Sequence, residues 1–444
     1  MTRTIPRRYS ATARAQSAVL DSSLVLASIA ALSLLAGLSK FGLFGMTGEI
    51  DKGSVAGQII WGATYATAAW RLIVFREGAI ALAKRSYPVV AFLVIILASS
   101  AWSVDFAITL KNAIEMIGTT LVCYYIAVRF TLREFLTILV RYFTVASIVS
   151  IVLIFAWPSH GRSSYGVVGW CGLWSEKNGF GAAMSIAILT YGVSFVLASG
   201  KRKWWLAAGF ALCAFSLVGS QSVTATIVLI ATVAIVTVIV TSSSPQYGMV
   251  ARLVSIVGGL AALIVVLASG FDASAAFDTI GKNSTLTGRA EFWPGLLRAI
   301  SDRPVLGFGY NAFFIASEPI NEYIAGLTGW WIPSTAHNSF YQMVLSVGFV
   351  GITVYALAVL PAIVTSLVQI VRNHELAAAW PFAIILFSLL GSFTEVYFGI
   401  PNTIGSICFT AAMLYAFKGF SEESTGVKPF HPTELRRKFS LTKV

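Results

Sequence analysis

The 444-residue sequence is poor in charge. Asp, Glu, Lys and Arg make up only 11% of it, whereas a soluble globular domain carries about a quarter. This composition excludes a soluble enzyme built on one core, and the 57% of hydrophobic residues excludes an intrinsically disordered chain. The fold class that remains is all-α: an integral membrane bundle that crosses the bilayer many times.

Cysteine and the common catalytic motifs are also scarce. The cysteines are few and widely spaced, which argues against a disulfide framework or a cysteine metal site, and we place three of them in apolar spans. The sequence has no Gly-Lys-Ser/Thr phosphate loop, His-Glu-x-x-His zinc motif, Cys-x-x-Cys pair or clustered Asp pair. We therefore expect no metal and no other cofactor. The remaining groups, Arg, Lys and His, suit a substrate that already carries an activated phosphate leaving group. The four cysteines are Cys123, Cys171, Cys213 and Cys408.

Apolar stretches long enough to cross a membrane recur about twelve times. Each has about 20 residues, the length that crosses roughly 30 Å of hydrocarbon, and tight hairpins at Gln221 and Asn402 separate two of the pairs. The first stretch lacks an obvious cleavage site and is followed by further spans, so we expect a retained helix. The expected spans are 17–38, 55–75, 87–104, 108–128, 134–157, 179–199, 203–219, 221–241, 251–270, 347–370, 379–397 and 400–417.

The distribution of positive charge predicts the orientation. The formal net charge is +12, and Lys and Arg collect in cytoplasmic loops of membrane proteins. With the N-terminus in the cytoplasm, 20 of the 31 Lys and Arg residues lie on the inner side and 9 on the outer side, and two fall within spans. We therefore expect both termini to be cytoplasmic, and a lipid bilayer rather than nucleic acid as the partner of the basic chain.

The spans divide the chain into four parts. Residues 1–270 form a membrane bundle of nine spans, 271–346 a large outer loop, 347–417 the last spans and 418–444 a basic cytoplasmic tail. A loop of about 75 residues is far longer than an ordinary connection, so we look for function there and in the outer loop 158–178. Within the large loop, apolar side chains at helical spacing predict an amphipathic helix over 289–301, and Pro294 favours a start nearer Trp293.

His337, at the end of the large loop, is the first candidate for chemistry. A neutral imidazole at the membrane surface can serve as a general base near pH 7. The alternative is a residue at a helix entry that only bonds the backbone.

Three basic side chains of the outer loops are candidates for binding phosphate. The guanidinium of Arg289 has a planar fork that binds phosphate oxygens bidentately, and Arg162 and Lys177 lie in the second loop. The alternatives are an interfacial anchor for Arg289 and, for Lys177, a pair with Glu176 or snorkelling at a helix start.

Several ionisable residues fall within or near spans. Snorkelling explains most of them, but charges in membrane segments are costly and tend to mark functional sites. Glu395 is the most interesting, because it faces the same outer side as the two long loops. The others are Arg71, Asp105, Lys111, Glu115 and Arg141.

Four motifs in order resemble the O-antigen ligase and polymerase superfamily, and most closely its branch of exopolysaccharide polymerases of the succinoglycan type. They cover about residues 160–355. The motifs are Glu176-Lys177-Asn178-Gly179-Phe180-Gly181, Thr287-Gly288-Arg289 with Trp293, Pro304-Val305-Leu306-Gly307-Phe308-Gly309, and Ala336-His337-Asn338-Ser339-Phe340 followed by Gly348 and Gly351.

The resemblance implies a glycosyltransferase-type polymerase of the bacterial inner membrane. Such proteins use a glycan carried on undecaprenyl diphosphate at the periplasmic face and transfer it with inversion and without metal. Carried over, His337 is the base that activates the acceptor hydroxyl, Arg289, Arg162 and Lys177 bind the diphosphate, and Asn338, Asn178 and Glu176 support them. Loop aromatics such as Trp330, Trp331 and Tyr310 stack on sugars or form an interfacial belt.

Two other functions stay open. A ligase would move the same glycan onto lipid A core, and a transporter or flippase for lipid-linked glycans would also have an even number of spans, although no two-half repeat is visible. Family members usually work beside a flippase and a chain-length regulator, which are the implied protein partners.

Overall fold

The computed structural model of the protein describes residues 11–38, 55–163, 169–243, 289–314 and 334–419, with positions 249, 253, 256–258, 322 and 325–326; side chains at 11–18, 35–38 and 289–292 are not described. These ranges are helical, and apart from one backbone bridge between Arg162 and Trp170 they contain no β-structure. In chain order the principal helices are α1 (Ala11–Leu38), α2 (Val55–Val74), α3 (Arg76–Arg85), α4 (Tyr87–Ala98), the 3-10 helix η3 (Ser99–Trp102), α5 (Phe106–Arg129), α6 (Leu132–Ala156), α7 (Pro158–Gly161), α8 (Lys177–Leu197), α9 (Arg202–Ser220), α10 (Val223–Ser243), α13 (Arg289–Asp302), α15 (Ser339–Val371), the 3-10 helix η5 (Leu376–Ala378), α16 (Ala379–Gly391) and α17 (Ile404–Lys418).

The helices confirm the all-α, multi-pass membrane architecture. Six described helices are long and apolar enough to cross a membrane, or seven if the bent pair of α3 with α4 and η3 counts as one span, and three shorter apolar helices accompany them. The spans expected between residues 55 and 241 coincide with helices to within two residues. The span expected at 251–270 lies outside the described residues, so the count of twelve stays a prediction. All four cysteines are buried and none is in a disulfide; three of them lie in α5, α9 and α17.

One helix, α3, has no counterpart among the expected spans. It follows α2 directly and bends by 87° into α4 and η3. Its ends carry the charged residues Arg76, Glu77, Lys84 and Arg85, which are costly to place in hydrocarbon. The chain between the second and third spans is therefore a short polar helix lying across the end of the bundle.

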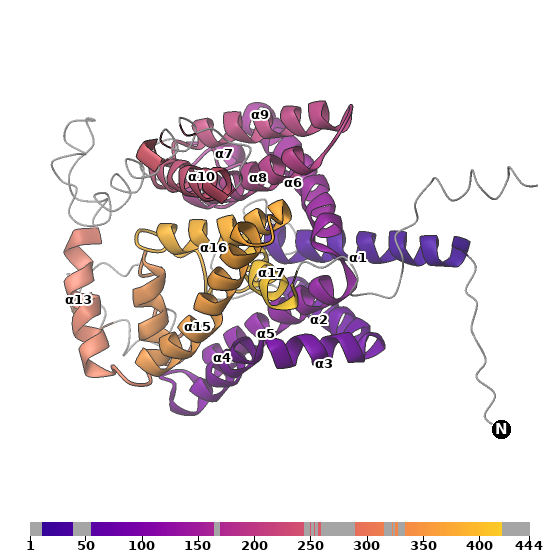
Figure 1. Cartoon of the computed structure of the whole chain (residues 1–444). Helices are drawn as coiled ribbons and strands as arrows, with labels where there is room; N and C mark the ends of the chain where they lie inside the picture. The colour runs from indigo at the N-terminus through magenta and orange to yellow at the C-terminus, as the bar shows by residue number, and fades with distance from the viewer. Residues whose placement is uncertain are drawn as a thin grey trace, which may run out of the picture.

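The bundle has two ends (Figure 1), and their polar residues differ. We call one the loop end, made of residues 99–105, 169–178, 219–223, 303–314, 334–339 and 392–403. Hydrogen bonds join its parts: Trp170 N donates to Gly219 O over 2.9 Å, and Val104 N donates to Phe308 O over 2.9 Å. Helix α13 lies across this end beside the first turns of α15.

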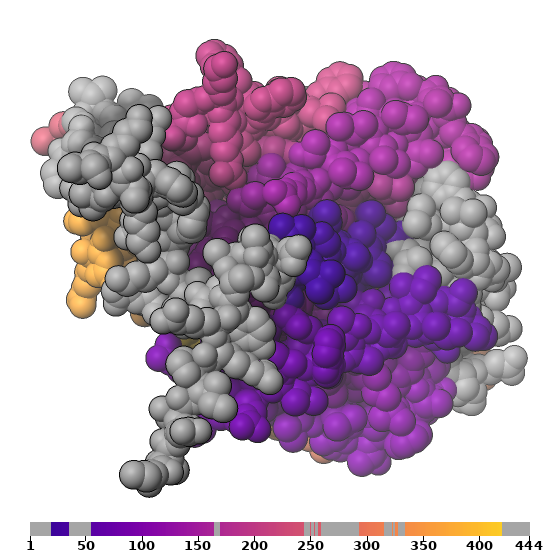
Figure 2. All heavy atoms as spheres, turned by 90° about the vertical axis from the view of Figure 1, so that its right-hand side faces the viewer, coloured from indigo at the N-terminus to yellow at the C-terminus, as the bar shows by residue number. Residues whose placement is uncertain are grey.

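We call the opposite end the charged end, after Asp21, Arg71 and Arg129. Helix α1 emerges at its centre (Figure 2) and packs against α2, α5, α6 and α17. The carboxylate of Asp21 is fully buried and pairs with the Arg71 guanidinium, with Arg129 Nε at 2.6 Å and with the hydroxyl of Tyr125 at 3.0 Å. The Phe75 ring lies 5.1 Å from the Arg71 guanidinium and 5.9 Å from that of Arg129. This cluster ties α1 to α2 and α5.

Helix α15 is interrupted at Gly348, close to where a span was expected to begin at residue 347. Gly348 has φ of 66°, and an added Cβ would lie 2.1 Å from Val305 O. Glycine is therefore required there. The segment after α13 fills the break: Phe308 N donates to Leu345 O over 2.7 Å, and Phe349 N donates to Pro304 O over 2.8 Å. The motif around residues 304–309 thus packs against the kink of α15.

The last two helices differ from the expected spans. The apolar run to residue 397 and a tight hairpin at Asn402 were expected, but α16 ends at Gly391 and α17 begins at Ile404. The expected end at residue 397 and the expected start at residue 400 were both wrong. Residues Ser392 to Thr403 form a loop that is hydrogen-bonded to the start of α15, as described below. Asn402 has φ of 56° and its side-chain oxygen accepts hydrogen bonds from Tyr65 and Thr119, each 2.8 Å long.

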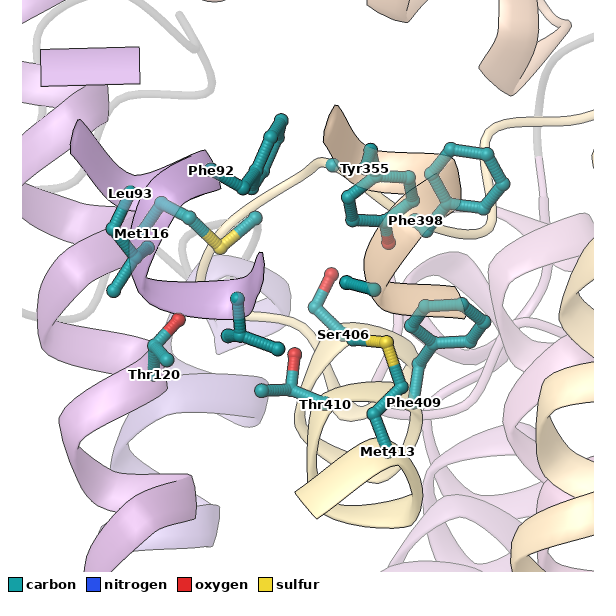
Figure 3. A pocket seen from close by; sticks show the side chains of 13 residues that line it. Phe92, Leu93, Met116, Thr120, Tyr355, Phe398, Ser406, Phe409, Thr410 and Met413 are labelled. Atoms are coloured by element: carbon teal, nitrogen blue, oxygen red, sulfur yellow. The ribbon is translucent and has the colours of Figure 1, made fainter. Parts of the chain in front are cut away.

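A small cavity lies inside the bundle between α4, α5, α15 and α17 (Figure 3). Its volume of about 20 Å³ has room for about one water molecule. The hydroxyl-bearing residues Thr120, Tyr355, Ser406 and Thr410 line it among apolar side chains. It is too small for a ligand larger than a few atoms.

Candidate active site

The turn before α15 sets the position of His337. Asn338 has extended backbone angles, and its side-chain oxygen accepts hydrogen bonds from Phe340 N at 2.9 Å and Tyr341 N at 3.1 Å. It is therefore the N-cap of α15. His337 precedes it with φ of 47°, in the left-handed region that His adopts more readily than most residues. The reversal turns the imidazole towards the loop between α16 and α17.

His337 is paired with Glu395 from that loop. His337 Nδ1 lies 2.9 Å from Glu395 Oε2, and the two side chains are 26% and 14% exposed. An ionised carboxylate only accepts hydrogen bonds, so the contact puts the proton on Nδ1 and leaves the lone pair on Nε2. A neutral imidazole in this tautomer can take a proton through Nε2 while the carboxylate stabilises the resulting charge.

Asn178 holds the other oxygen of Glu395. Its side-chain amide donates to Glu395 Oε1 over 2.9 Å, and its own oxygen accepts from Ser222 Oγ over 3.1 Å. Both oxygens of the carboxylate are therefore oriented. The contact brings together α8, α10, the α16–α17 loop and the start of α15, which are far apart in the sequence.

The backbone around Glu395 is attached directly to the cap of α15. Ser339 N donates to Ser392 O over 2.9 Å, Asn338 Nδ2 donates to Phe393 O over 3.1 Å, and Ser339 Oγ donates to Glu395 O over 3.1 Å. These three hydrogen bonds hold the loop of Glu395 against the turn that carries His337, as the preorganisation of a functional pair requires.

Helix α13 supports the same turn from the other side. Trp293 Nε1 donates to the carbonyl of Ala336 over 3.0 Å, and the Gln342 side chain accepts from Ala336 N over 2.9 Å. The amphipathic helix was correctly predicted: Leu296 and Ile300 are buried. Its expected start near Trp293 was wrong, because the helix runs from Arg289 with Pro294 inside it.

The predicted site residues are only partly brought together. His337, Asn338 and Asn178 meet through Glu395 and its loop. Lys177 is the first residue of α8, next to Asn178, with its side chain beside Gly169. Glu176 is the N-cap residue of α8 but provides no side-chain cap within the described part of the chain.

The two arginines are described to different extents. Arg289 opens α13, whose Trp293 reaches Ala336, but its side chain lies outside the described residues, as do Trp330 and Trp331. Arg162 is exposed beside Trp170, and no hydrogen bond or ion pair between described residues joins it to His337. Tyr310 is fully buried and donates to Gly399 O over 2.8 Å, so the idea that it stacks on a sugar was wrong.

Sequence reasoning drew attention to Glu395 but did not pair it with His337. The signal was its position near the outer end of a span. The pairing needed the loop between α16 and α17, which hydropathy did not reveal. Within the described residues no three His, Cys, Asp or Glu side chains gather closely enough to hold a metal ion.

Fold and site together define a polytopic helical membrane protein with a His–Glu pair at one end of its bundle. Residues 187–356 match the O-Antigen ligase family. The chain is also 28% identical over 338 residues to the exopolysaccharide production protein ExoQ of Rhizobium meliloti (strain 1021), covering 70% of this chain and 73% of that protein. Both comparisons confirm the resemblance inferred from the motifs: the chain is similar to the O-Antigen ligase family over residues 187–356 and to ExoQ over a longer stretch.

Proposed function

We propose that the protein is a membrane polymerase that moves a glycan from undecaprenyl diphosphate onto another lipid-linked repeat unit in exopolysaccharide synthesis. The contact of 2.9 Å between His337 and Glu395 is the observation that carries the proposal, because it supplies an oriented base beside loops suited to an anionic substrate. The relationship to the exopolysaccharide production protein ExoQ supports the choice of polymer.

The reaction needs one proton transfer. The acceptor hydroxyl oxygen attacks C1 of the donor sugar, its proton passes to His337 Nε2, and the bond from C1 to the phosphate oxygen breaks with its electrons moving to the diphosphate. Attack from the face opposite the leaving group inverts C1. Glu395 keeps the imidazole in the required tautomer and stabilises the imidazolium that forms.

The developing charge on the diphosphate also has to be balanced. We assign this role to Arg289 from the start of α13 and Lys177 from the start of α8, with Arg162 as a further contact. The backbone N–H groups at the start of α8 add partial positive charge next to Asn178. Preorganised cations can stabilise a leaving diphosphate without a metal, which is why we propose a metal-independent reaction.

The proposal includes a location. The loop end lies at the periplasmic face of a bacterial inner membrane, and both termini are cytoplasmic, as the Lys and Arg distribution favours. At that face the protein meets lipid-linked substrates delivered by a flippase, and a chain-length regulator is a further proposed partner.

A ligase that transfers the glycan to lipid A core is the second candidate, and the match to the O-Antigen ligase family favours it. Donor chemistry at His337 and Glu395 is the same in both. The polymerase and the ligase differ only in the acceptor that receives the glycan.

A reconstituted assay tests the proposal. Purified protein is given the lipid-diphosphate-linked repeat unit of its host, with a chelator present. We expect a ladder of lipid-linked products from the wild type and none from His337→Asn, whose side chain tolerates the left-handed backbone at this position. His337→Ala should be equally inactive.

Other outcomes of this assay have clear meanings. Equal ladders from wild type and His337→Asn would remove the base assignment. Products formed only when lipid A core is supplied would establish the ligase, and dependence on added divalent metal would overturn the metal-independent step.

Arg289 gives a further test. Arg289→Ala should weaken donor use, and Arg289→Lys should restore little of it, because an ammonium lacks the bidentate fork. The Michaelis constant of the donor is the readout. Full activity of Arg289→Ala would remove this residue from the diphosphate site.

A further inference from the structure

A second site candidate lies between the first halves of α2 and α5. An open groove of about 440 Å³ runs there, which falls in the size range of ligand pockets. Its walls are mostly apolar, with Trp61, Tyr65, Leu110 and Ile114 among them, and Lys111 contributes a positive charge. An apolar groove with a cation suits a lipid that carries an anionic headgroup.

The groove belongs to the same end of the bundle as His337. Trp102 Nε1, just before α5, donates to Leu306 O over 2.9 Å, and Asn112 on α5 donates to Asn311 O over 3.2 Å. Both acceptors belong to the segment that packs against α15. A lipid in the groove and a substrate at His337 therefore approach from one membrane face.

The groove is nevertheless separate from the His337 site. Asn112 contacts Asn311, and Asn311 in turn accepts a hydrogen bond from Gln342 at 3.2 Å, the residue that bonds Ala336. Lys111 instead lines the groove beside α2. Helix α5 and the segment after α13 thus lie between the two sites.

The walls of the groove are held by contacts behind them. Tyr65 donates to Asn402 Oδ1 over 2.8 Å, and Trp61 Nε1 donates to Ala31 O over 3.1 Å. At Gly118 an added Cβ would lie 2.4 Å from the Tyr65 ring, so glycine lets α2 approach α5. A preformed groove binds with less loss of conformational entropy.

We propose that this groove binds the lipid diphosphate of the acceptor, with the Lys111 ammonium at its phosphates. The inference rests on the proposed function, in which both substrates are lipid-linked. The donor diphosphate leaves from the reacting C1 and must lie beside His337. The acceptor hydroxyl is at the far end of a repeat unit, so the acceptor diphosphate must lie at the same face but away from His337, as Lys111 does.

Glu115, the second charged residue of the groove, should affect anion binding in the opposite sense to Lys111. It lies one turn along α5 from Lys111 and also lines the groove. Between described residues the Lys111 ammonium makes no hydrogen bond or close salt bridge, and the Glu115 carboxylate attracts it through charge. Removing Lys111 should weaken binding of an anion, whereas removing the carboxylate of Glu115 should leave it unchanged or strengthen it.

Two modified substrates separate the acceptor from the donor. The donor carries a deoxygenated terminal sugar and can only donate, and the acceptor carries a methylene phosphonate at C1 and can only accept. For Lys111→Met we expect the Michaelis constant of the acceptor to rise roughly tenfold to a hundredfold, the loss of a charge-assisted contact. Ala107→Phe should also raise the Michaelis constant of the acceptor, because the larger side chain fills the groove, whereas Glu115→Gln should not raise it. The Michaelis constant of the donor should change less than about twofold in all three variants.

Matched controls on the exposed face of α3 are Lys84→Met and Ala81→Phe, which should change neither constant. A rise in the donor constant instead, or no change with Lys111→Met and Ala107→Phe, would overturn the proposal.

If the wild type makes no product, that result counts against the proposed function but not against the groove. A binding measurement then tests the groove by itself. Native mass spectrometry with undecaprenyl diphosphate should show two bound lipids for the wild type and for His337→Asn, but one for Lys111→Met. Equal stoichiometry in all three, or equal displacement by phosphatidylglycerol, would reject the groove as a specific site.

Discussion

The two ends of the bundle use ionisable groups in opposite ways. At the charged end, the Asp21 carboxylate is 0% exposed and is shared by two guanidiniums. At the loop end, the side chains of His337 and Glu395 are 26% and 14% exposed, and the pair joins one imidazole to one carboxylate. The first arrangement joins helices, and the second leaves reactive atoms near solvent.

The supporting residues differ in the same sense. At the Asp21 cluster, aromatic rings lie against the two guanidiniums, among them those of Phe75 and Tyr125. Around His337 and Glu395, the contacts come from the Asn338 cap of α15, from backbone carbonyls of the α16–α17 loop and from the Asn178 amide. A buried charge is therefore weak evidence of a site, whereas a partly exposed pair on an ordered loop is stronger evidence.

The largest effect that would sharpen this comparison is expected for His337→Asn. Loss of a general base lowers the rate by roughly 100- to 10,000-fold, while the melting temperature in detergent should stay near that of the wild type. The ladder assay measures the rate, and a thermal unfolding scan in detergent measures the melting temperature. A large drop in melting temperature would mean that His337 is structural like Asp21.

Glu395→Gln should come next, with a loss of roughly 100-fold or more. The Gln amide can donate to Nδ1 and so place the proton on Nε2, the wrong nitrogen for a base. Glu395→Asp keeps the acceptor and should retain more activity than Glu395→Gln in the same assay. Similar rates for the two variants would contradict a role in fixing the tautomer.

Asp21→Asn should affect stability rather than turnover. It leaves two guanidiniums without their carboxylate, a change that costs roughly 3–5 kcal/mol when a buried pair is broken. Unfolding in detergent should occur at lower temperature, with normal turnover per folded molecule. Glu77→Gln on the exposed surface of α3 is the control and should change neither property.

Asn178→Ala is expected to have the smallest effect, a loss of roughly tenfold in rate, because one hydrogen bond to a charged group disappears while the His337 contact remains. Ser222→Ala, one step further away, should cost less. Turnover at saturating substrate is the measurement. An Asn178→Ala loss as large as that of His337→Asn would move Asn178 into direct contact with the reaction.

Much of the fold could be predicted because membrane spans are long apolar runs. The helices α2, α4 with η3, α5, α6, α8, α9 and α10 follow hydropathy to within two residues. The charged helix α3 and the loop from Ser392 to Thr403 could not be found this way. The helix is too polar to count as a span, and the loop has apolar residues scattered among its polar ones, which extend the apparent run of α16. The loop exists because it bonds the cap of α15.

The site was predictable one residue at a time but not as a pair. His337 stood out as an outer histidine and Glu395 as a carboxylate near a span end. Their contact depends on a left-handed backbone at His337 and on bonds from Asn338 and Ser339 to the loop, which no local pattern encodes. Arg71 was noted only as an ionisable residue within a span, whereas it pairs with Asp21 50 residues away.

The break at Gly348 has a consequence for how the protein fits its bilayer. A straight helix of the 33 residues of α15 would be about 50 Å long, well beyond the roughly 30 Å of hydrocarbon. Interruption at Gly348 leaves a second part of about 35 Å, close to membrane thickness, and assigns the first turns to the loop end. The tilt of the spanning part can then adjust to bilayers of different thickness. The segment before Gly348 keeps His337 in contact with Glu395.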